Sequence, residues 1–407
     1  MTIENDFLTF AGGGSALVLS QADYVAAATL RANGFQVGIA EPDQLNKVWR
    51  QASIIAAMVA QFIVDETGQP AIDDGTVPTL EANFISAIQF AAGVANSGGF
   101  INGFRNASNT VANRGTSGTV SAATTVYTMD GWRIGAVGAS IAWAQAATVG
   151  SAPFALQMTG QVGVTDASVG QRIESLISIA YASRAIVFQQ KVKNNSGASI
   201  TPTLTIKHAN SPDNFGATTT DLNAQALQAC PDGATTVVSW LGTANAAAGN
   251  GLEFTLDFGA GINGAGKAVT VGDADVRLGS IVSSPEIRNI TTEQLQCQRY
   301  LPSIVPGANS SIGAAALQNT HDADVDFKFL VPARVPTTGL SISAAADFSL
   351  TLSGVNHACT TVAFSNAGLY GATITASDSV NAYTANSCTI FQSQSGSASL
   401  VLTGAEL

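Results

Sequence analysis

The chain has 407 residues, which is enough for two to four domains of roughly 100–200 residues each. Charged residues make up only 11% of it, against a usual share of about 25%, and the net charge is −11. Since affinity for nucleic acid comes mainly from Lys and Arg, this composition argues against a nucleic-acid partner. No run approaches the ~20 uninterrupted apolar residues that a membrane helix requires, so we expect no membrane insertion.

The first ten residues, MTIENDFLTF, lack the basic region and the apolar core of a secretory signal. A protein of this kind that acts outside the cell would leave it by another route. Release by lysis, inside an assembled particle, is one such route.

Residues 1–98 are predicted to form a helical domain. Ser20 and Asp23 resemble an N-cap, and Asn33 with Gly34 resembles a stop, which predicts a helix from about 21 to 32. A longer helix is predicted to start at Pro42, which suits a first helical turn, and a third around residues 80–91.

The long helix carries apolar residues on more than one face. One set recurs at the three–four spacing of a single helix face, and Ile54 with Met58 forms a second stripe. A helix that is apolar on two faces requires more than one neighbour, which indicates assembly with other subunits. The candidate contact residues are Leu45, Trp49, Ile54, Ile55, Met58 and Phe62.

Residues 99–123 are dominated by Gly, Ser, Asn and Thr. One interpretation is a flexible linker. The other is an extended, intertwined shaft, because Phe100, Ile101, Phe104 and Val111 are too apolar for a pure spacer. The composition leaves both interpretations open.

From about residue 124 the apolar period changes to two, with turn clusters between short segments. This pattern predicts a jelly-roll β-sandwich over 124–288 and a second β-sandwich over 302–407. A short helical hinge over 289–301 separates them, with Thr291 and Gln294 spaced as a capping box. The fold class is therefore mainly β with an α-helical N-terminal domain.

Sites of metal or redox chemistry receive little support from the sequence. Cys230, Cys297, Cys359 and Cys388 form no CxxC pair, and we expect buried thiols, although Cys359 and Cys388 could meet within one sandwich. The strand residues Asp322, Asp324 and Asp326 could hold calcium, but the glycine turn and the later glutamate of a calcium loop are missing. A solvated strand face is the preferred interpretation there, and also for Asp273 and Asp275. We expect no cofactor, no metal and no catalytic residues.

Several segments resemble tail-fibre proteins of bacteriophages that infect Gram-negative bacteria. The segment DQLNKVWRQASIIAAMVAQFIVDETGQPAIDDGT is similar to their N-terminal helical region, and KHANSPDNFGATTTDL and VTVGDADVRLGSI to their jelly-roll module. TTEQLQCQRYLPSI resembles their hinge, and FKFLVPARVPTTGLSISA through LVLTGAEL resembles their C-terminal tip. The similar segments cover most of the chain and stand in the expected order.

The resemblance implies a structural virion protein, made in the host cytoplasm and acting at the host cell surface. It implies a homotrimeric fibre whose N-terminal helices contact the phage tail or an adaptor protein. Its β-domains would bind host polysaccharide or lipopolysaccharide.

Aromatic side chains flanked by planar polar groups are typical of glycan recognition. The candidates are Trp132, Trp143, Asp213, Asn214 and Phe215 in the first β-domain, and Tyr370 and Tyr383 in the second. For both tryptophans a place in the core is the alternative, since Trp is mostly buried.

Two alternatives to a receptor-binding fibre remain at this stage. One is an adaptor that joins the tail to a separate receptor-binding protein. The other is a depolymerase that cleaves polysaccharide with paired carboxylates roughly 5–9.5 Å apart. The available carboxylates include Glu174, Glu253, Asp257 and Glu286.

Overall fold

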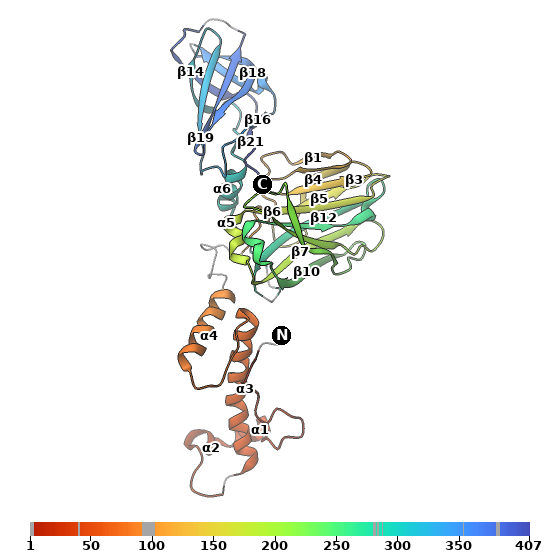
Figure 1. Ribbon diagram of the computed structural model, residues 1–407, viewed down its shortest axis with the longest axis vertical. Helices are drawn as coiled ribbons and strands as arrows, with labels where there is room; N and C mark the ends of the chain where they lie inside the picture. Colours follow the sequence, from red (N-terminus) through yellow and green to blue (C-terminus); the bar gives the residue numbers. More distant parts are fainter. Residues whose placement is uncertain are drawn as a thin grey trace. The chain divides into compact units, whose positions relative to one another are not determined.

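The computed structural model describes residues 4–39, 41–91, 102–279, 282, 285–286, 288–352, 354–379 and 383–407 (Figure 1). The chain divides into two compact units. One contains residues 1–101 with 185–187 and 277–281, and the other contains the remaining residues. The described chain is mainly β with a helical N-terminal segment, which confirms the predicted fold class.

The N-terminal unit contains the helices α1 (Gln21–Ala26), α2 (Ala28–Asn33), α3 (Pro42–Thr67) and α4 (Val77–Ala91). Ser20 caps α1 as predicted, because its side chain accepts a hydrogen bond from the Asp23 backbone. The predicted helix over 21–32 is wrong in its continuity: Ala27 has a non-helical ψ of 57° and separates α1 from α2. Helix α3 has Pro42 in its first turn and ends at Gly68, whose φ of 65° favours glycine.

Helix α3 is covered on only part of its surface. Ala60 and Ile63 are buried, and Phe62 packs edge-on against Phe84 of α4 with ring centroids 6.2 Å apart. The segment that precedes α1 runs along another part of the helix, where the Phe10 backbone donates to Ser53 Oγ at 2.9 Å. The rest of the apolar surface of α3 stays exposed in the single chain.

The second unit begins with a sandwich of two sheets of six strands each. The first has the order β1 (Ser117–Val120), β4 (Ile141–Ala147), β5 (Phe154–Thr159), β12 (Ala268–Leu278), β7 (Ala185–Asn195), β10 (Thr235–Thr243). The second has the order β2 (Thr124–Tyr127), β3 (Arg133–Val137), β6 (Asp166–Ile173), β11 (Leu252–Asp257), β8 (Thr203–Ala209), β9 (Thr218–Ala226). Phe188 of β7 stacks on Phe254 of β11 at 6.0 Å, so the core lies between the sheets.

Residues 102–116 belong to this sandwich, so both interpretations of 99–123 are wrong for the described part, while residues 99–101 lie outside it. Phe104 is 1% exposed, and its ring lies 5.5 Å from that of Phe254. The side-chain amide of Asn106 donates to the backbone oxygens of Val111 and Asp130 at 2.8 and 2.9 Å. Asparagine side chains thus replace the hydrogen bonds of regular structure and allow an irregular segment to be buried.

Short helical elements connect the strands. They are α5 (Ser175–Ser178) and the 3-10 turns Ile179–Tyr181, Ala246–Asn250, Gly259–Ile262 and Ala345–Asp347. Helix α6 (Ile290–Tyr300) lies where the short helix was predicted. Its N-cap is Asn289, whose side chain accepts a hydrogen bond from the Thr292 backbone, so the predicted capping box at Thr291 is wrong.

The last hundred residues form a closed barrel rather than the predicted second sandwich. Its strand order is β14 (Ser311–Leu317), β15 (Asp322–Lys328), β19 (Gly371–Asp378), β18 (Val355–Ala367), β17 (Phe348–Leu352), β20 (Cys388–Ser393), and β20 pairs again with β14. A separate sheet contains β13 (Ser303–Ile304), β21 (Leu400–Thr403) and β16 (Gly339–Ile342). Period-two alternation shows which side chains face inward, but it does not show whether a sheet closes on itself.

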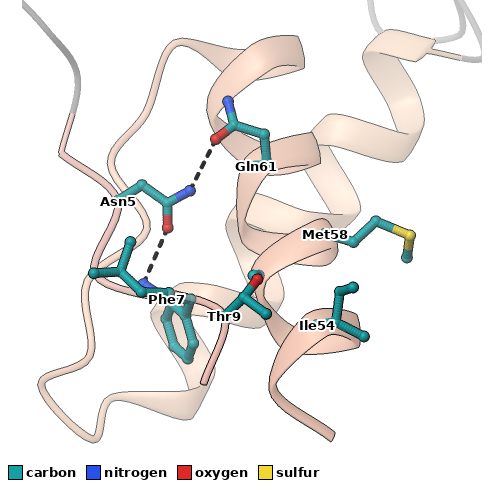
Figure 2. Close-up of a pocket in the computed structure, with 8 residues that line it drawn as sticks. Asn5, Phe7, Thr9, Ile54, Met58 and Gln61 are labelled. Carbon is teal, nitrogen blue, oxygen red and sulfur yellow. Dashed lines mark hydrogen bonds between the residues drawn. The ribbon is translucent and has the colours of Figure 1, made fainter. Parts of the chain in front are cut away.

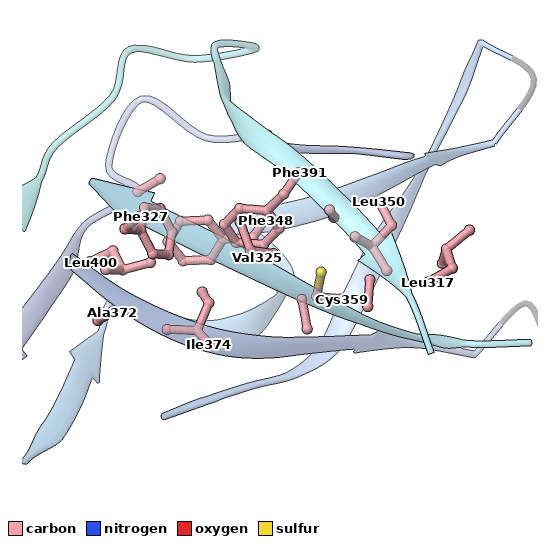
Figure 3. Packing of buried hydrophobic residues seen from close by; sticks show 14 of the residues in the cluster. Leu317, Val325, Phe327, Phe348, Leu350, Cys359, Ala372, Ile374, Phe391 and Leu400 are labelled. Carbon is pink, nitrogen blue, oxygen red and sulfur yellow. The ribbon is translucent and has the colours of Figure 1, made fainter. Parts of the chain in front are cut away.

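Figure 3 shows the barrel core, where Phe348 and Phe391 stack with ring centroids 5.3 Å apart. Ile374 of β19 lies in the same cluster and is fully buried. The core is therefore dense around these three side chains.

Replacing Ile374 by Ala should lower the free energy of unfolding of the barrel by about 2–5 kcal/mol, because it leaves a cavity in a packed core. The matched control is Ile390→Ala on β20, where the side chain is 46% exposed and the loss should stay below about 1 kcal/mol. Urea unfolding of both variants measures the difference. Equal losses would contradict this description of the core.

Candidate binding surfaces

The barrel and the sandwich are connected by a buried carboxylate, Glu174, at the start of α5. Arg299 of α6 donates to it through Nη2 at 2.5 Å and through Nε at 3.1 Å, and the Tyr300 hydroxyl donates at 2.6 Å. The Glu174 side chain is only 3% exposed. Burial alone would raise the pKa of Glu174, but the hydrogen bonds from Arg299 and Tyr300 outweigh it and hold that pKa below its usual value.

A second set of contacts involves residues 405–407. Arg334, which follows the barrel strand β15, donates to the backbone oxygens of Ala405 and Glu406 at 2.9 and 2.8 Å. Arg172 of the sandwich strand β6 donates to the backbone oxygen of Leu407 at 2.8 Å, and Arg114 forms an ion pair with Glu406. This last segment therefore contacts residues of both modules.

Helix α6 is held from a third direction by Glu293, which accepts a hydrogen bond from the Asn106 backbone at 2.6 Å. Cys297, one turn further along, is 1% exposed, and burial raises the pKa of its thiol. A helix fixed on several sides does not act as a free hinge, so the predicted hinge is instead a packed connection. We call the contacts of α6, Arg334 and residues 405–407 with the sandwich the joint.

Two loops that were predicted to bind glycans each contact the segment that carries Ala333 and Arg334. Asp213, in the loop after β8, accepts a hydrogen bond from the Ser175 backbone at 2.7 Å and lies 4.0 Å from Arg334 Nη1. The hairpin between β18 and β19 is held to the segment that carries Arg334, because the Ala333 backbone donates to Leu369 at 2.8 Å. Arg334 therefore connects a sandwich loop with a barrel hairpin.

These loops present exposed aromatic and amide groups. The Tyr370 side chain is 70% exposed in the barrel hairpin, and Asn214 is exposed in the sandwich loop. Phe215 is partly buried, with its ring 4.6 Å from the guanidinium of Arg172. We call Asp213, Asn214, Phe215, Tyr370 and Arg334 the joint surface.

Three of the predicted glycan contacts are corrected by their burial. Trp132 is 2% exposed, and its indole N–H donates to the Asn106 backbone oxygen at 3.0 Å. Trp143 is 8% exposed and covers Gly118 on the neighbouring strand β1. Tyr383 is 3% exposed, with its hydroxyl 2.6 Å from an Asp378 oxygen. In each case the ring serves the core and offers no face to an external sugar.

Among the six predicted assembly residues, four are exposed on α3: Trp49, Ile54, Ile55 and Met58 are 51%, 51%, 57% and 59% accessible. Leu45 and Phe62 are partly buried. Ile54 and Met58 line a groove of about 440 Å³ together with Asn5, Phe7 and Thr9 of the preceding segment. These lining residues are drawn in Figure 2. The Asn5 amide donates to Gln61 at 3.1 Å and bridges the two sides.

The acidic residues considered for metal binding or catalysis mostly have protein partners. Asp324 accepts from Thr375 at 2.8 Å, Asp326 accepts from Thr373 at 2.6 Å, and Lys191 contacts Asp273 at 2.8 Å. Within the described ranges, no three His, Cys, Asp or Glu side chains are grouped as metal ligands would be. All four cysteines are free thiols, and Cys388 is exposed rather than buried as predicted.

The remaining carboxylates from the depolymerase alternative are also engaged. Glu253 binds Arg133 and Arg172, and Glu286 accepts from the Asn102 backbone at 2.8 Å. Burial, together with a hydrogen bond to Asp166, raises the pKa of Asp257 to about 6. No helix in the described part of the chain has the length and apolar character needed to cross a membrane.

The sequence did not single out Arg299, Tyr300 or Arg334 as functional residues. The CQRY segment is marked only by its resemblance to fibre hinges. No local pattern connects its Arg299 with Glu174, which is 125 residues away in the sequence. The scarcity of arginine in a chain with 11% charged residues is the one signal that could have directed attention to these positions.

No family model and no curated protein matches this chain. Among solved structures, it is similar to the CBM22-1 xylan-binding domain of Paenibacillus barcinonensis Xyn10C, with 16% identity over 40% of this chain and 99% of that chain, at a TM-score of 0.28. The CBM22-1-CBM22-2 tandem of the same protein is 10% identical over 71% of this chain and 99% of that chain, at a TM-score of 0.28. The enzymatically active domain of bacteriophage CBA120 tailspike protein 4 is 10% identical over 44% of this chain and 21% of that chain, at a TM-score of 0.29. Such remote likeness carries no argument about ligand or assembly.

Replacing Glu174 by Gln should lower the free energy of unfolding at pH 7 by about 1.5–3 kcal/mol, the usual loss for charged hydrogen bonds. Because the pKa of Glu174 is lowered in the fold, its charge stabilises the protein above about pH 4.5 and loses this effect as the pH falls through the lowered pKa. Glu174→Gln should therefore lose less stability than the unchanged protein between pH 7 and about pH 3.5.

Urea midpoints at the two pH values provide this measurement. Glu81→Gln on the exposed surface of α4 is the control and should follow the unchanged protein. If Glu174→Gln and the unchanged protein lose the same free energy of unfolding between the two pH values, the joint does not depend on this charge.

Proposed function

We propose that this chain is a bacteriophage tail-fibre subunit that attaches the virion to polysaccharide or lipopolysaccharide on a Gram-negative host. Three chains associate through the N-terminal helices, which also contact the tail or an adaptor protein. The sandwich and the barrel, fixed together at the joint, make the contact with the host surface. The order of the tail-fibre-like segments in the sequence supports this proposal.

The observation that carries the proposal is the joint surface. Tyr370 offers an exposed ring, and Asn214 offers an exposed planar amide, groups that suit the apolar face and the hydroxyl groups of a sugar. Asp213 and Arg334 behind them are held by hydrogen bonds and by each other, so the loops are positioned before a ligand arrives.

The exposed side chains of α3 support association of identical chains. Between residues 51 and 64 the helix carries no charged side chain, so a second copy can pack against it without burying an unpaired charge. Isolated apolar side chains at a surface are ordinary, but Ile54, Ile55 and Met58 lie together and face more than one direction. Weak binding at each of three joint surfaces would then add up through avidity.

Two other functions give different outcomes in the same experiment. An adaptor without receptor binding would assemble but would not bind polysaccharide. A depolymerase would bind polysaccharide and release sugar from it. Binding without release favours the attachment function.

The full-length chain should bind polysaccharide purified from at least some Gram-negative strains of a panel, with no sugar released. Tyr370→Ala should weaken that binding about tenfold, since loss of a central aromatic contact typically costs more than 1 kcal/mol. Asn214→Ala should weaken it by a smaller factor, because one planar amide contact is lost. Surface plasmon resonance with immobilised polysaccharide gives both values.

Phe154→Ala removes a different aromatic ring of the same unit, 41% exposed on β5, and should leave the affinity unchanged. If all three substitutions reduce binding equally, the joint surface is not the specific contact. If no polysaccharide of the panel binds the unchanged chain, the attachment proposal itself is wrong and the adaptor function is favoured.

The intact chain should have about three times its chain mass of 41.3 kDa in solution. Replacing both Ile54 and Met58 by Glu should reduce that mass, because it would bury charge in the helical interface. Light scattering measures both forms, and Val162→Glu, at a 79% exposed site in the sandwich, is the control. A monomeric mass for the unchanged chain would contradict the trimer.

A further inference from the structure

A row of charged side chains crosses the outer face of the second sheet of the sandwich. In the register of β6, β11 and β8, Arg172 lies opposite Glu253, and Glu253 lies opposite Lys207. The residues that flank them along the strands are buried on the other face, among them Phe254 and Ile206. Alternation along each strand therefore directs Arg172, Glu253 and Lys207 away from the core.

Arg133 of β3 completes this group. Its Nη1 donates to Glu253 Oε2 at 2.6 Å, and Arg172 Nε donates to the same oxygen at 2.5 Å. Burial alone would raise the pKa of Glu253. The hydrogen bond from Arg172 and the positive charges of Arg172, Arg133 and Lys207 outweigh burial and lower that pKa. One carboxylate is thus shared by three cationic side chains. We call Arg133, Arg172, Glu253 and Lys207 the cation row.

The cation row has donors left for a ligand. In the described part of the chain, no hydrogen bond or ion pair engages the Lys207 ammonium, which acts on Glu253 only through its charge. Arg133 uses one N–H donor on Glu253, and Arg172 uses two, on Glu253 and on the Leu407 backbone oxygen. A guanidinium has five such donors, and the side chains of Arg133 and Arg172 are 18% and 17% exposed.

The surroundings of the row suit a sugar. Thr255 of β11 lies opposite Thr205 of β8, and both are partly exposed on the same sheet face. The ring of Phe215 covers the Arg172 guanidinium at 4.6 Å. The ring of Tyr127 lies 5.7 Å from the Arg133 guanidinium. Hydroxyl groups thus form the floor beside the cations, and aromatic rings border it.

Negative charge at the opposite end of the same face would confine an anionic ligand to the cation row. Asp257 lies four residues beyond Glu253 along β11 and is hydrogen-bonded with Asp166. A carboxylate or phosphate would be repelled there and attracted by the three cations. A neutral sugar would gain nothing from this separation of charges.

We propose that the cation row binds the anionic group of the host glycan, a carboxylate or a phosphate, next to the joint surface that holds the sugar rings. This inference rests on the proposed function, since it specifies the class of glycan recognised. Phe215 belongs to the joint surface and covers Arg172 of the row, so the two regions are in contact at this ring. The planar fork of arginine matches the oxygens of both anions, and lysine adds a point charge.

The test compares the unchanged chain with Lys207→Gln and Lys207→Glu, because Lys207 can be changed without breaking a described hydrogen bond. The probes are polysaccharide and lipopolysaccharide from strains of the panel that the unchanged chain binds, each used untreated, after carbodiimide reduction of its carboxyl groups, and after removal of its phosphates. Binding is measured by isothermal titration calorimetry at low and high salt. Circular dichroism confirms that each variant is folded.

Lys207→Gln should weaken binding to the untreated probe roughly threefold to tenfold, and Lys207→Glu should weaken it further. The matched control, Lys267→Gln, removes the same charge from an exposed loop and should bind normally. Loss of binding after carboxyl reduction identifies a carboxylate ligand, and loss after phosphate removal identifies a phosphate. Higher salt should weaken binding in either case.

Binding that survives both treatments and both Lys207 substitutions would overturn this inference while leaving the attachment proposal intact. The inference would also be overturned if the unchanged chain binds the treated, neutral probe as tightly as the untreated one while Tyr370→Ala binds it more weakly. If the unchanged chain binds polysaccharide or lipopolysaccharide from no strain of the panel, the proposed function is refuted instead.

Discussion

The burial of the Glu174 carboxylate under Arg299 and Tyr300 is the constraint on which the rest of the second unit depends. Removing a charge from water is costly unless its hydrogen bonds are complete, and here three donors reach the two oxygens of Glu174. These hydrogen bonds hold α6 against the sandwich. That placement also sets the position of Arg334, and Arg334 sets the distance between the sandwich loop and the barrel hairpin.

Arginine is concentrated at this connection in a chain that has little charge elsewhere. Arg105 lies over the Tyr300 ring at 4.0 Å, and Arg114 pairs with Glu406. Replacing buried ion pairs by apolar residues is often neutral or stabilising, so such pairs are weak evidence of optimised stability. Their directional hydrogen bonds do restrict geometry, and a restricted geometry is what two modules need if they are to share one binding surface.

Capping residues and apolar periodicity predicted individual helices and strands, but they did not predict which distant strands pair. The start of α3 followed from Pro42, and α6 was predicted near its place although its N-cap is Asn289. Barrel closure depends on β20 returning to β14, which alternation along a strand does not encode. The burial of Trp132 depends on Asn106 in a segment whose composition is typical of a loop. The loops with Asn214 and Tyr370 were predicted as candidates, but the contact between Glu174 and Arg299 was not, because no sequence spacing relates these two residues.

The two kinds of surface on this chain suit the two tasks of an attachment fibre. In the proposed fibre, the apolar, uncharged surface of α3 would associate strongly with its own copy, because burial of Ile54, Ile55 and Met58 requires no exact pairing of polar groups. The polar joint surface would bind a hydrated glycan weakly, since each contact replaces a contact with water. A rigid joint reduces the entropy lost on binding, because the loops are ordered in advance. Weak sites on a strongly associated fibre give reversible contact at one chain and durable attachment of the whole particle.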